Sequence, residues 1–222
     1  MIRSIPFIVL VASLTLTSAL AVLAGWSSGA HVWILALGLA VGVALTLSQP
    51  RDWRRAFVGI FAVGLLARTL AHLTIYGWAS ASGGPFLSPD ATLYFRDSLQ
   101  LAANDFATGV PGYVYFGTFD CAHYYLFAAV RWLLDADLFA LQTLNLVLSS
   151  VVGPLTFAVA KRVGVPHAGR VGLVVALYPT LIALSVNDMM KDAGIVGLSM
   201  IGIWALVEIW QDLLGIEPVG IH

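Results

Sequence analysis

Residues 56–78, AFVGIFAVGLLARTLAHLTIYGW, decide the fold, because they form an apolar run that holds one cation, Arg68, and one histidine, His72. A transmembrane helix needs about 20 predominantly apolar residues, and this run has that length. A long polar segment, residues 79–120, follows it directly. We therefore expect a membrane-spanning helix that leads into a large loop outside the bilayer.

The composition of the whole chain agrees with this run. Of its 222 residues, 59% are hydrophobic and 10% are charged, with a mean hydropathy of +0.90, whereas soluble domains are about 25% charged. Lipid is therefore the expected surrounding, and the formal net charge of −1 gives no reason to expect nucleic acid as a partner. The single cysteine, Cys121, excludes an internal disulfide and a cysteine-based metal site.

Further apolar runs meet or approach the length of a span. We predict an all-α, polytopic integral membrane protein with about six transmembrane helices and one or two juxtamembrane helices in its first large outer loop. The predicted spans are residues 5–24, 32–48, 56–78, 138–160, 171–186 and 193–210. The first run also fits a signal peptide, since Arg3 precedes it, but its length favours an uncleaved helix.

Basic residues predict the orientation, because short cytoplasmic loops are enriched in Lys and Arg. Arg51, Arg54 and Arg55 place the turn before residues 56–78 inside. We therefore expect loop 79–137 to be extracytoplasmic in a plasma (inner) membrane protein.

The side of the membrane on which each later loop lies depends on the short apolar segment 121–134. This segment could cross the membrane or lie along its surface. Its length and its charge at Arg131 favour the surface. Residues 138–160 then run inward, which places the next basic cluster inside and the segment 187–192 on the same outer face as Asp90. That basic cluster consists of Lys161, Arg162 and Arg170.

Asp90 is the leading candidate for a catalytic group. It follows Pro89 and precedes residues 91–103, which have helical character. Tyr94 lies one turn later on the same face of that helix. The alternative is that Asp90 only caps the helix, and the two roles are compatible because a helix start also offers N–H groups to phosphate.

Arg68 and His72 share one face of their predicted span. A charge at mid-span costs about 2.5–3.5 kcal/mol on insertion scales, so Arg68 is expected to face a bundle interior or a polar cavity. It either pairs with an acid in a neighbouring segment or holds an anionic headgroup. His72 is expected to be a packed or hydrogen-bonded side chain.

The second outer segment carries Asp188, Lys191 and Asp192. These residues form either a solvated loop or a site in which Lys191 holds a phosphate and an acid helps to bind a metal. A divalent cofactor, Mg²⁺ or Mn²⁺, is left open, with Asp90, Asp188 and Asp192 as its candidate ligands.

Two patterns predict helix packing. Gly38 and Gly42 form a small-xxx-small motif, which is typical of closely packed helices. Gln142 and Asn145 lie within an apolar run and are expected to make interhelical hydrogen bonds.

Between residues 57 and 210 the chain carries, in this order, the segments RTL (68–70), PDATLY (89–94), HYYLF (123–127), LQTLN (141–145), AKRVG (160–164), LYPT (177–180) and MKD (190–192). In order and spacing, these segments resemble the lipid-donor glycosyltransferases of C-type fold (GT-C), in particular the bacterial branch similar to glycosyltransferase family 39. Residues 1–50 then form two extra N-terminal transmembrane helices and residues 51–212 the GT-C-like module. The tail, residues 213–222, is a candidate truncation point. We therefore expect either a fragment of a longer protein, or a reduced relative that has lost activity or works with a partner subunit.

The resemblance implies a transfer of a sugar, with inversion, from a polyprenyl-phosphate donor to a cell-envelope acceptor. It implies that Asp90 is the general base and that Asp188 or Asp192 is the acid of the second loop. The substrate contacts are expected at Arg68, Tyr94, His123 and Lys191. The alternative function is a non-catalytic membrane subunit that binds or flips a lipid-phosphate carrier.

Overall fold

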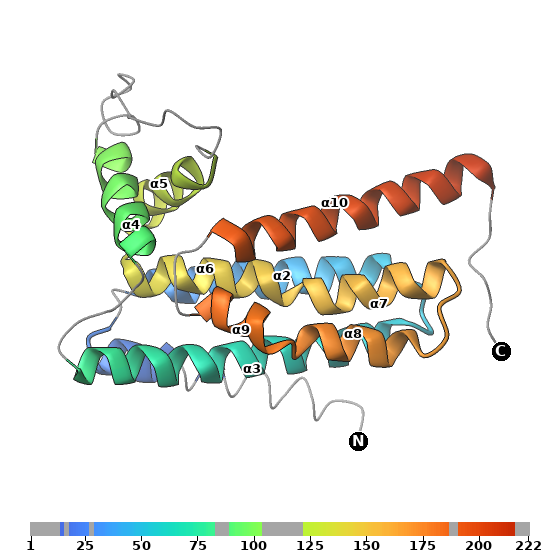
Figure 1. The fold of residues 1–222 in the computed structure, drawn as a ribbon, viewed down its shortest axis with the longest axis horizontal. Helices are drawn as coiled ribbons and strands as arrows, with labels where there is room; N and C mark the ends of the chain where they lie inside the picture. The colour runs from blue at the N-terminus through green and yellow to red at the C-terminus, as the bar shows by residue number, and fades with distance from the viewer. Residues whose placement is uncertain are drawn as a thin grey trace.

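The computed structural model describes residues 14–15, 18–26, 29–82, 89–103, 122–186 and 191–215, with the backbone alone at 89–91, 93, 122, 123 and 191. All regular elements in these ranges are helices, so the all-α prediction is confirmed (Figure 1). The helices are α2 (Ala30–Ser48), α3 (Arg54–Ala81), α4 (Pro89–Leu101), α5 (Ala122–Leu134), α6 (Leu138–Ser150), α7 (Val152–Arg162), α8 (Ala168–Ala176), α9 (Pro179–Val186) and α10 (Lys191–Leu214).

The described residues contain four helices that are long and apolar enough to cross a membrane. They are α2, α3, the continuous stretch α6–α7 and α10. If the bent pair α8–α9 forms one span, the number of candidate spans rises to five. Most of the predicted first span, residues 5–24, lies outside the described residues. The protein is therefore a membrane protein with four to five candidate spans in its described part.

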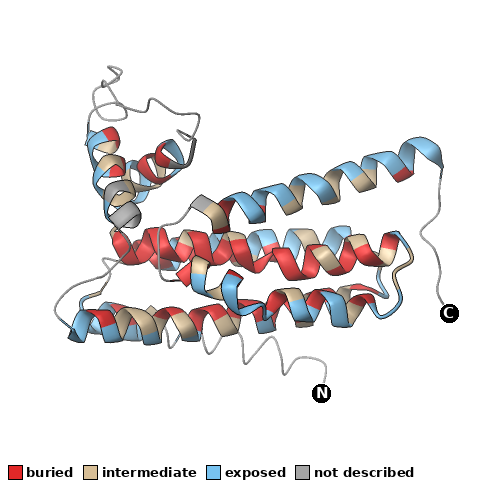
Figure 2. Cartoon of the chain, in the orientation of Figure 1, coloured by how far each residue is buried: buried red, intermediate tan, exposed pale blue. Residues whose placement is uncertain are grey.

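The stretch α6–α7 is the centre of the bundle. Its most apolar window is 78% buried, whereas that of α10 is only 11% buried (Figure 2). The stretch starts at Asp137, whose carboxylate accepts a hydrogen bond from the Ala140 N–H at 2.9 Å, as a good N-cap does. The exposed apolar side chains of α10 are those expected of a helix that faces lipid.

The small-xxx-small motif of α2 packs as predicted. A Cβ added at Gly38 would lie 2.4 Å from a methyl group of Val147 in α6, and one added at Gly42 would lie 2.7 Å from the ring of Phe61 in α3. The two glycines therefore let α2 approach both neighbours more closely than any larger residue would allow. The predicted close packing is confirmed.

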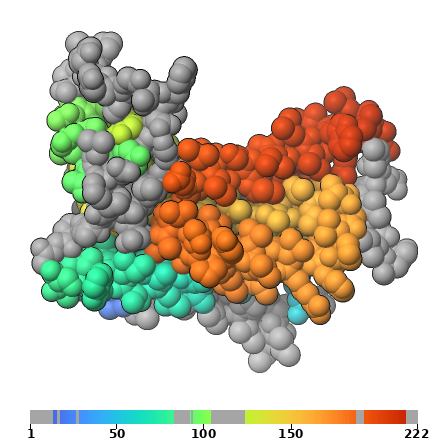
Figure 3. All heavy atoms as spheres, viewed as in Figure 1, coloured from blue at the N-terminus to red at the C-terminus, as the bar shows by residue number. Residues whose placement is uncertain are grey.

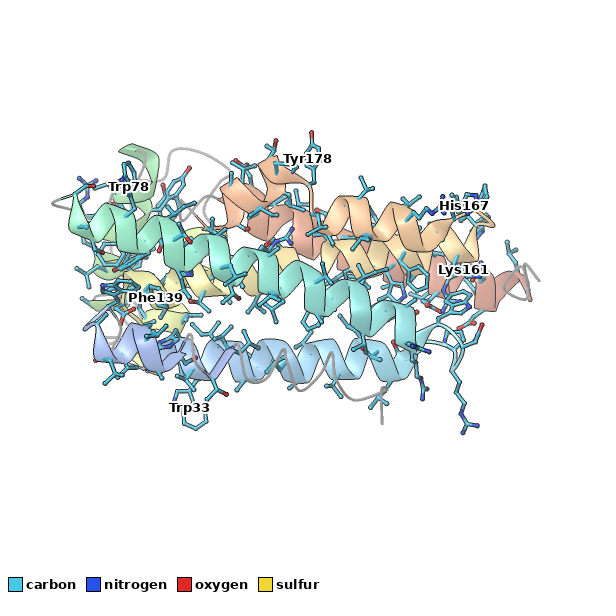
Figure 4. All side chains as sticks on the ribbon, turned by 90° about the horizontal axis from the view of Figure 1, so that it is seen from below. Trp33, Trp78, Phe139, Lys161, His167 and Tyr178 are labelled. Carbon is cyan, nitrogen blue, oxygen red and sulfur yellow. The ribbon has the colours of Figure 1, made fainter. Side chains whose placement is uncertain are left out.

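Both basic clusters lie at one end of the bundle, which we call the basic end. The ring of Trp53, in the turn between α2 and α3, lies 5.9 Å from Lys161 Nζ and 5.2 Å from Arg162 Cζ. Arg162 also pairs with Glu208 near the end of α10. Lys161 and His167 lie at this end in Figure 4, far from Trp78 and Phe139 at the other.

The α4–α5 pair lies at the opposite end, which we call the α4–α5 end (Figures 1 and 3). Helix α5 is 13 residues long and packs on α4, outside the row of long helices. A span needs about 20 residues, so α5 does not cross the bundle. This agrees with the surface placement expected for segment 121–134.

We predict that Gly38→Leu destabilises the protein by about 1–3 kcal/mol, because the new side chain would overlap Val147 and force α2 away from α6. The measurement is the midpoint of unfolding in detergent. Gly202→Ala in α10, where an added Cβ meets nothing within 4 Å, is the matched control and should be neutral or stabilising. Equal losses in both variants would contradict the close contact.

We predict that the two ends of the bundle are accessible from opposite sides of the membrane. In a Cys121→Ser background, Arg96→Cys in α4 should react with an impermeant maleimide added to intact cells, since the Arg96 side chain is 62% exposed. Arg55→Cys, at the start of α3 and therefore at the basic end, should react only after the membrane is permeabilised. Labelling of both variants from one side would overturn this topology.

Candidate functional site

The α4–α5 end is built on a hairpin of two short helices that pack through aromatic side chains. The rings of Tyr94 in α4 and Tyr124 in α5 meet edge to face, with centroids 5.1 Å apart. Arg131 of α5 lies 4.5 Å above the ring of Phe95 in α4. Burial lowers the pKa of Arg131, while the nearby Asp137 and Asp135 act in the opposite direction.

Tyr94, predicted as a substrate contact, is thus half-buried in this hairpin. Asp90 is the second residue of α4, directly after Pro89, which suits the first position of a helix because its missing N–H would have no partner there. The side chains of Asp90 and His123 lie outside the described part of the chain. Their predicted roles stay predictions.

The second predicted loop leads into α10. Asp192 lies half-buried in the first turn of that helix, whereas Asp188 and the side chain of Lys191 lie outside the described residues. Helix α10 begins against α6, because a Cβ at Gly194 would lie 3.4 Å from Asn145 Oδ1. The start of α10 and the start of α6 are therefore in the same half of the bundle as α4 (Figure 3).

A metal site is not formed by the side chains that the structure describes: no group of three His, Cys, Asp or Glu is placed to hold an ion among them. Two of the candidate ligands, Asp90 and Asp188, lie outside that search. The metal therefore stays an open prediction, and no step below depends on it.

Arg68 lies in the middle of the bundle and is completely buried. Its Nε donates to Ser149 Oγ at 3.0 Å, and its Nη1 donates to the carbonyl oxygens of Ala176 at 2.7 Å and Gly64 at 3.1 Å. Within the described residues it forms no ion pair, and Nη2 has no hydrogen-bond partner. The expected acid is thus replaced by neutral oxygens from three helices, and a headgroup contact by Arg68 stays a prediction.

The shortest of these contacts, to the Ala176 carbonyl, explains how a broken span is tolerated. Residues 171–186 were predicted as one helix, but α8 ends at Ala176, α9 starts at Pro179, and their axes differ by 41°. In an unbroken helix the N–H of residue 180 would donate to the Ala176 carbonyl. The proline break frees that carbonyl, and Arg68 takes over as its donor.

Small residues bring the partners together around the break. A Cβ added at Gly153 would lie 2.6 Å from the Ala176 Cβ, and one at Gly64 would lie 3.3 Å from it. Helices α3 and α7 thus contact the end of α8 closely enough for the guanidinium to reach its carbonyl. Tyr178, in the break itself, points away from the bundle (Figure 4).

His72 is a hydrogen-bonded and packed side chain, as predicted. Its Nε2 lies 3.0 Å from Gln142 Oε1 in α6, and its ring stacks on Phe139 at 4.3 Å. The same contact confirms that Gln142 makes an interhelical hydrogen bond. Tyr76 and His31 meet the Phe139 ring edge on, so α2, α3 and α6 share one aromatic cluster near the α4–α5 end.

Sequence reasoning missed Ser149, Ala176 and Asp137 as partners in this arrangement. The signal for Ala176 was present, because Pro179 stands inside an apolar run and a proline frees the carbonyls of the preceding turn. The signal for Asp137 was also present, since Asp directly before an apolar helix is a frequent N-cap.

Comparison with known proteins adds no family assignment: no family model matches the chain, and no curated protein or solved structure resembles it significantly.

We predict that Arg68→Met lowers the free energy of unfolding by about 2 kcal/mol, because the Ala176 carbonyl loses its donor in a water-free interior. Arg170→Met, a cation of the basic end, is the control. In a Pro179→Ala background the helix can close across the break and satisfy the carbonyl itself. The loss of stability caused by Arg68→Met should then be smaller than in the wild-type background. An equal loss in both backgrounds of this double-mutant cycle would contradict the assigned contact.

Proposed function

We propose that the protein is a membrane glycosyltransferase. It transfers a sugar from a polyprenyl-phosphate donor to a hydroxyl of a cell-envelope acceptor, with inversion, at the extracytoplasmic face. The observation that carries the proposal is that α4, with Asp90 in its first turn, lies at the end of the bundle opposite both basic clusters. The first turn of α10, with Lys191 and Asp192, starts in the same half of the molecule.

This placement supports a reaction at the membrane surface. The Asp90 carboxylate takes the proton of the acceptor hydroxyl, whose oxygen attacks the anomeric carbon of the sugar. The bond from that carbon to the phosphate oxygen breaks, and the polyprenyl phosphate leaves with the electron pair. A base at hydrogen-bond distance from the hydroxyl and a cation near the leaving phosphate meet the needs of this step, and Asp90 and Lys191 take these roles.

Arg68 serves the same site indirectly. Its hydrogen bond to the Ala176 carbonyl fixes the break between α8 and α9, and α9 leads to the segment that holds Asp188 and Lys191. We therefore place Arg68 as a positioning residue, although the resemblance made it a phosphate contact.

We predict that Asp90→Asn lowers turnover at least 100-fold, the lower limit for the loss of a general base, while the protein still inserts and folds. The measurement is release of undecaprenyl phosphate from an undecaprenyl-phosphate hexose by membranes that contain the protein. Asp97→Asn is the matched control on the same helix, because Asp97 pairs with its exposed neighbour Arg96 at 2.9 Å. The control should stay within twofold of the wild type.

Other outcomes of the same experiment distinguish the enzyme from the rival function, a non-catalytic subunit that binds a lipid-phosphate carrier. If the wild type binds the lipid phosphate, releases no sugar, and keeps this binding in Asp90→Asn, the protein is a non-catalytic carrier-binding subunit. If Asp90→Asn and the wild type turn over equally, the proposed base is wrong.

A further inference from the structure

An apolar groove runs between α2 and α3 in the half of the bundle nearer the basic end. Its cavity volume is about 140 Å³. The groove is lined by Leu39, Gly42, Val43, Thr46, Leu47, Val58 and Phe61.

Among the described lining residues, the one polar side chain is already paired. The hydroxyl of Thr46 donates to the Gly42 carbonyl at 2.7 Å. Val43 and Leu47, two of the lining residues, are 49% and 59% exposed, so the groove has an open rim. The lining thus suits a hydrocarbon chain.

One end of the groove meets a concentration of positive charge. The Nη2 of Arg54 donates to the carbonyl of Leu47, a lining residue, at 2.6 Å, and its Nε donates to the carbonyl of Gln49 at 2.9 Å. The guanidinium is therefore held at the groove's end. Arg51 and Arg55 are exposed beside it, and within the described part of the chain these arginines form no ion pair.

We propose that this groove is a binding site for an anionic glycerophospholipid of the leaflet at the basic end. One acyl chain fills the groove and the phosphate lies between Arg51 and Arg55, with Arg54 at the junction. The charge pattern supports this occupant, because a hydrocarbon groove that ends in arginines without an ion-pair partner among the described residues matches a ligand with an apolar tail and an anionic head. The site is independent of sugar transfer, since it lies at the end away from α4.

The experiment measures lipid retention by the purified protein with native mass spectrometry. Wild-type protein is offered phosphatidylglycerol or phosphatidylcholine with identical acyl chains. The double variant Arg51→Gln/Arg55→Gln should lose about 30-fold in affinity for phosphatidylglycerol, the effect of removing two interfacial cations, with little change for phosphatidylcholine. Val43→Trp should fill the groove and weaken both lipids, while Leu206→Trp, on the exposed face of α10, should weaken neither.

A photoreactive residue at position 43 keeps the proposal testable if Val43→Trp fails to fold. A covalent adduct with phosphatidylglycerol is the expected product. A cross-link from position 43 to residues 5–13 of the same chain would show that the chain fills its own groove and would overturn the proposal. Equal retention of the two lipids by the wild type would overturn it as well. So would binding that is weakened by Arg51→Gln/Arg55→Gln and unchanged in a folded Val43→Trp variant.

Discussion

The hydrogen bond from Arg68 to the Ala176 carbonyl is the constraint on which the bundle depends. Inside a bilayer a backbone carbonyl without a donor costs several kcal/mol, and the break before Pro179 creates one. Arg68 reaches it from α3 and also binds Ser149 in α6. One side chain thus ties three membrane elements together, and its positive charge is favoured at the C-terminal end of α8, where the helix dipole is negative.

The rest of the core is arranged so that this contact can form. Glycines at positions 64 and 153 remove the side chains that would separate α3 and α7 from the end of α8. The aromatic cluster around Phe139 and the His72–Gln142 hydrogen bond hold α3 against α6 nearer the α4–α5 end. The Arg68–Ser149 and His72–Gln142 hydrogen bonds therefore both cross the α3–α6 contact, and such pairing lowers the cost of a buried cation there.

The sequence was sufficient for features that depend on local spacing, and insufficient for those that depend on a distant backbone atom. The close packing at Gly38 and Gly42 follows from a four-residue interval. Polar residues on apolar helices predict that His72 and Gln142 are hydrogen-bonded, but only the structure shows that they bond to each other. The carbonyl that accepts from Arg68 lies 108 residues away; Pro179 indicates that a carbonyl is freed near it, but nothing in the sequence indicates that Arg68 is its donor. The same limit applies to Trp53, which lies buried against Lys161 and Arg162 from a distant part of the chain.

The two ends of the bundle have different chemistry, and this difference bears on both proposals. Moving the basic end across a membrane would carry Arg51, Arg54, Arg55 and the Lys161–Arg162 pair with it, which the positive-inside rule disfavours. The rule thus predicts that the α4–α5 end is on the outer side, which is the side on which the proposed sugar transfer needs the carboxylate at the start of α4. An anionic phospholipid bound at the basic end would strengthen this orientation, because it anchors the arginines in the inner leaflet.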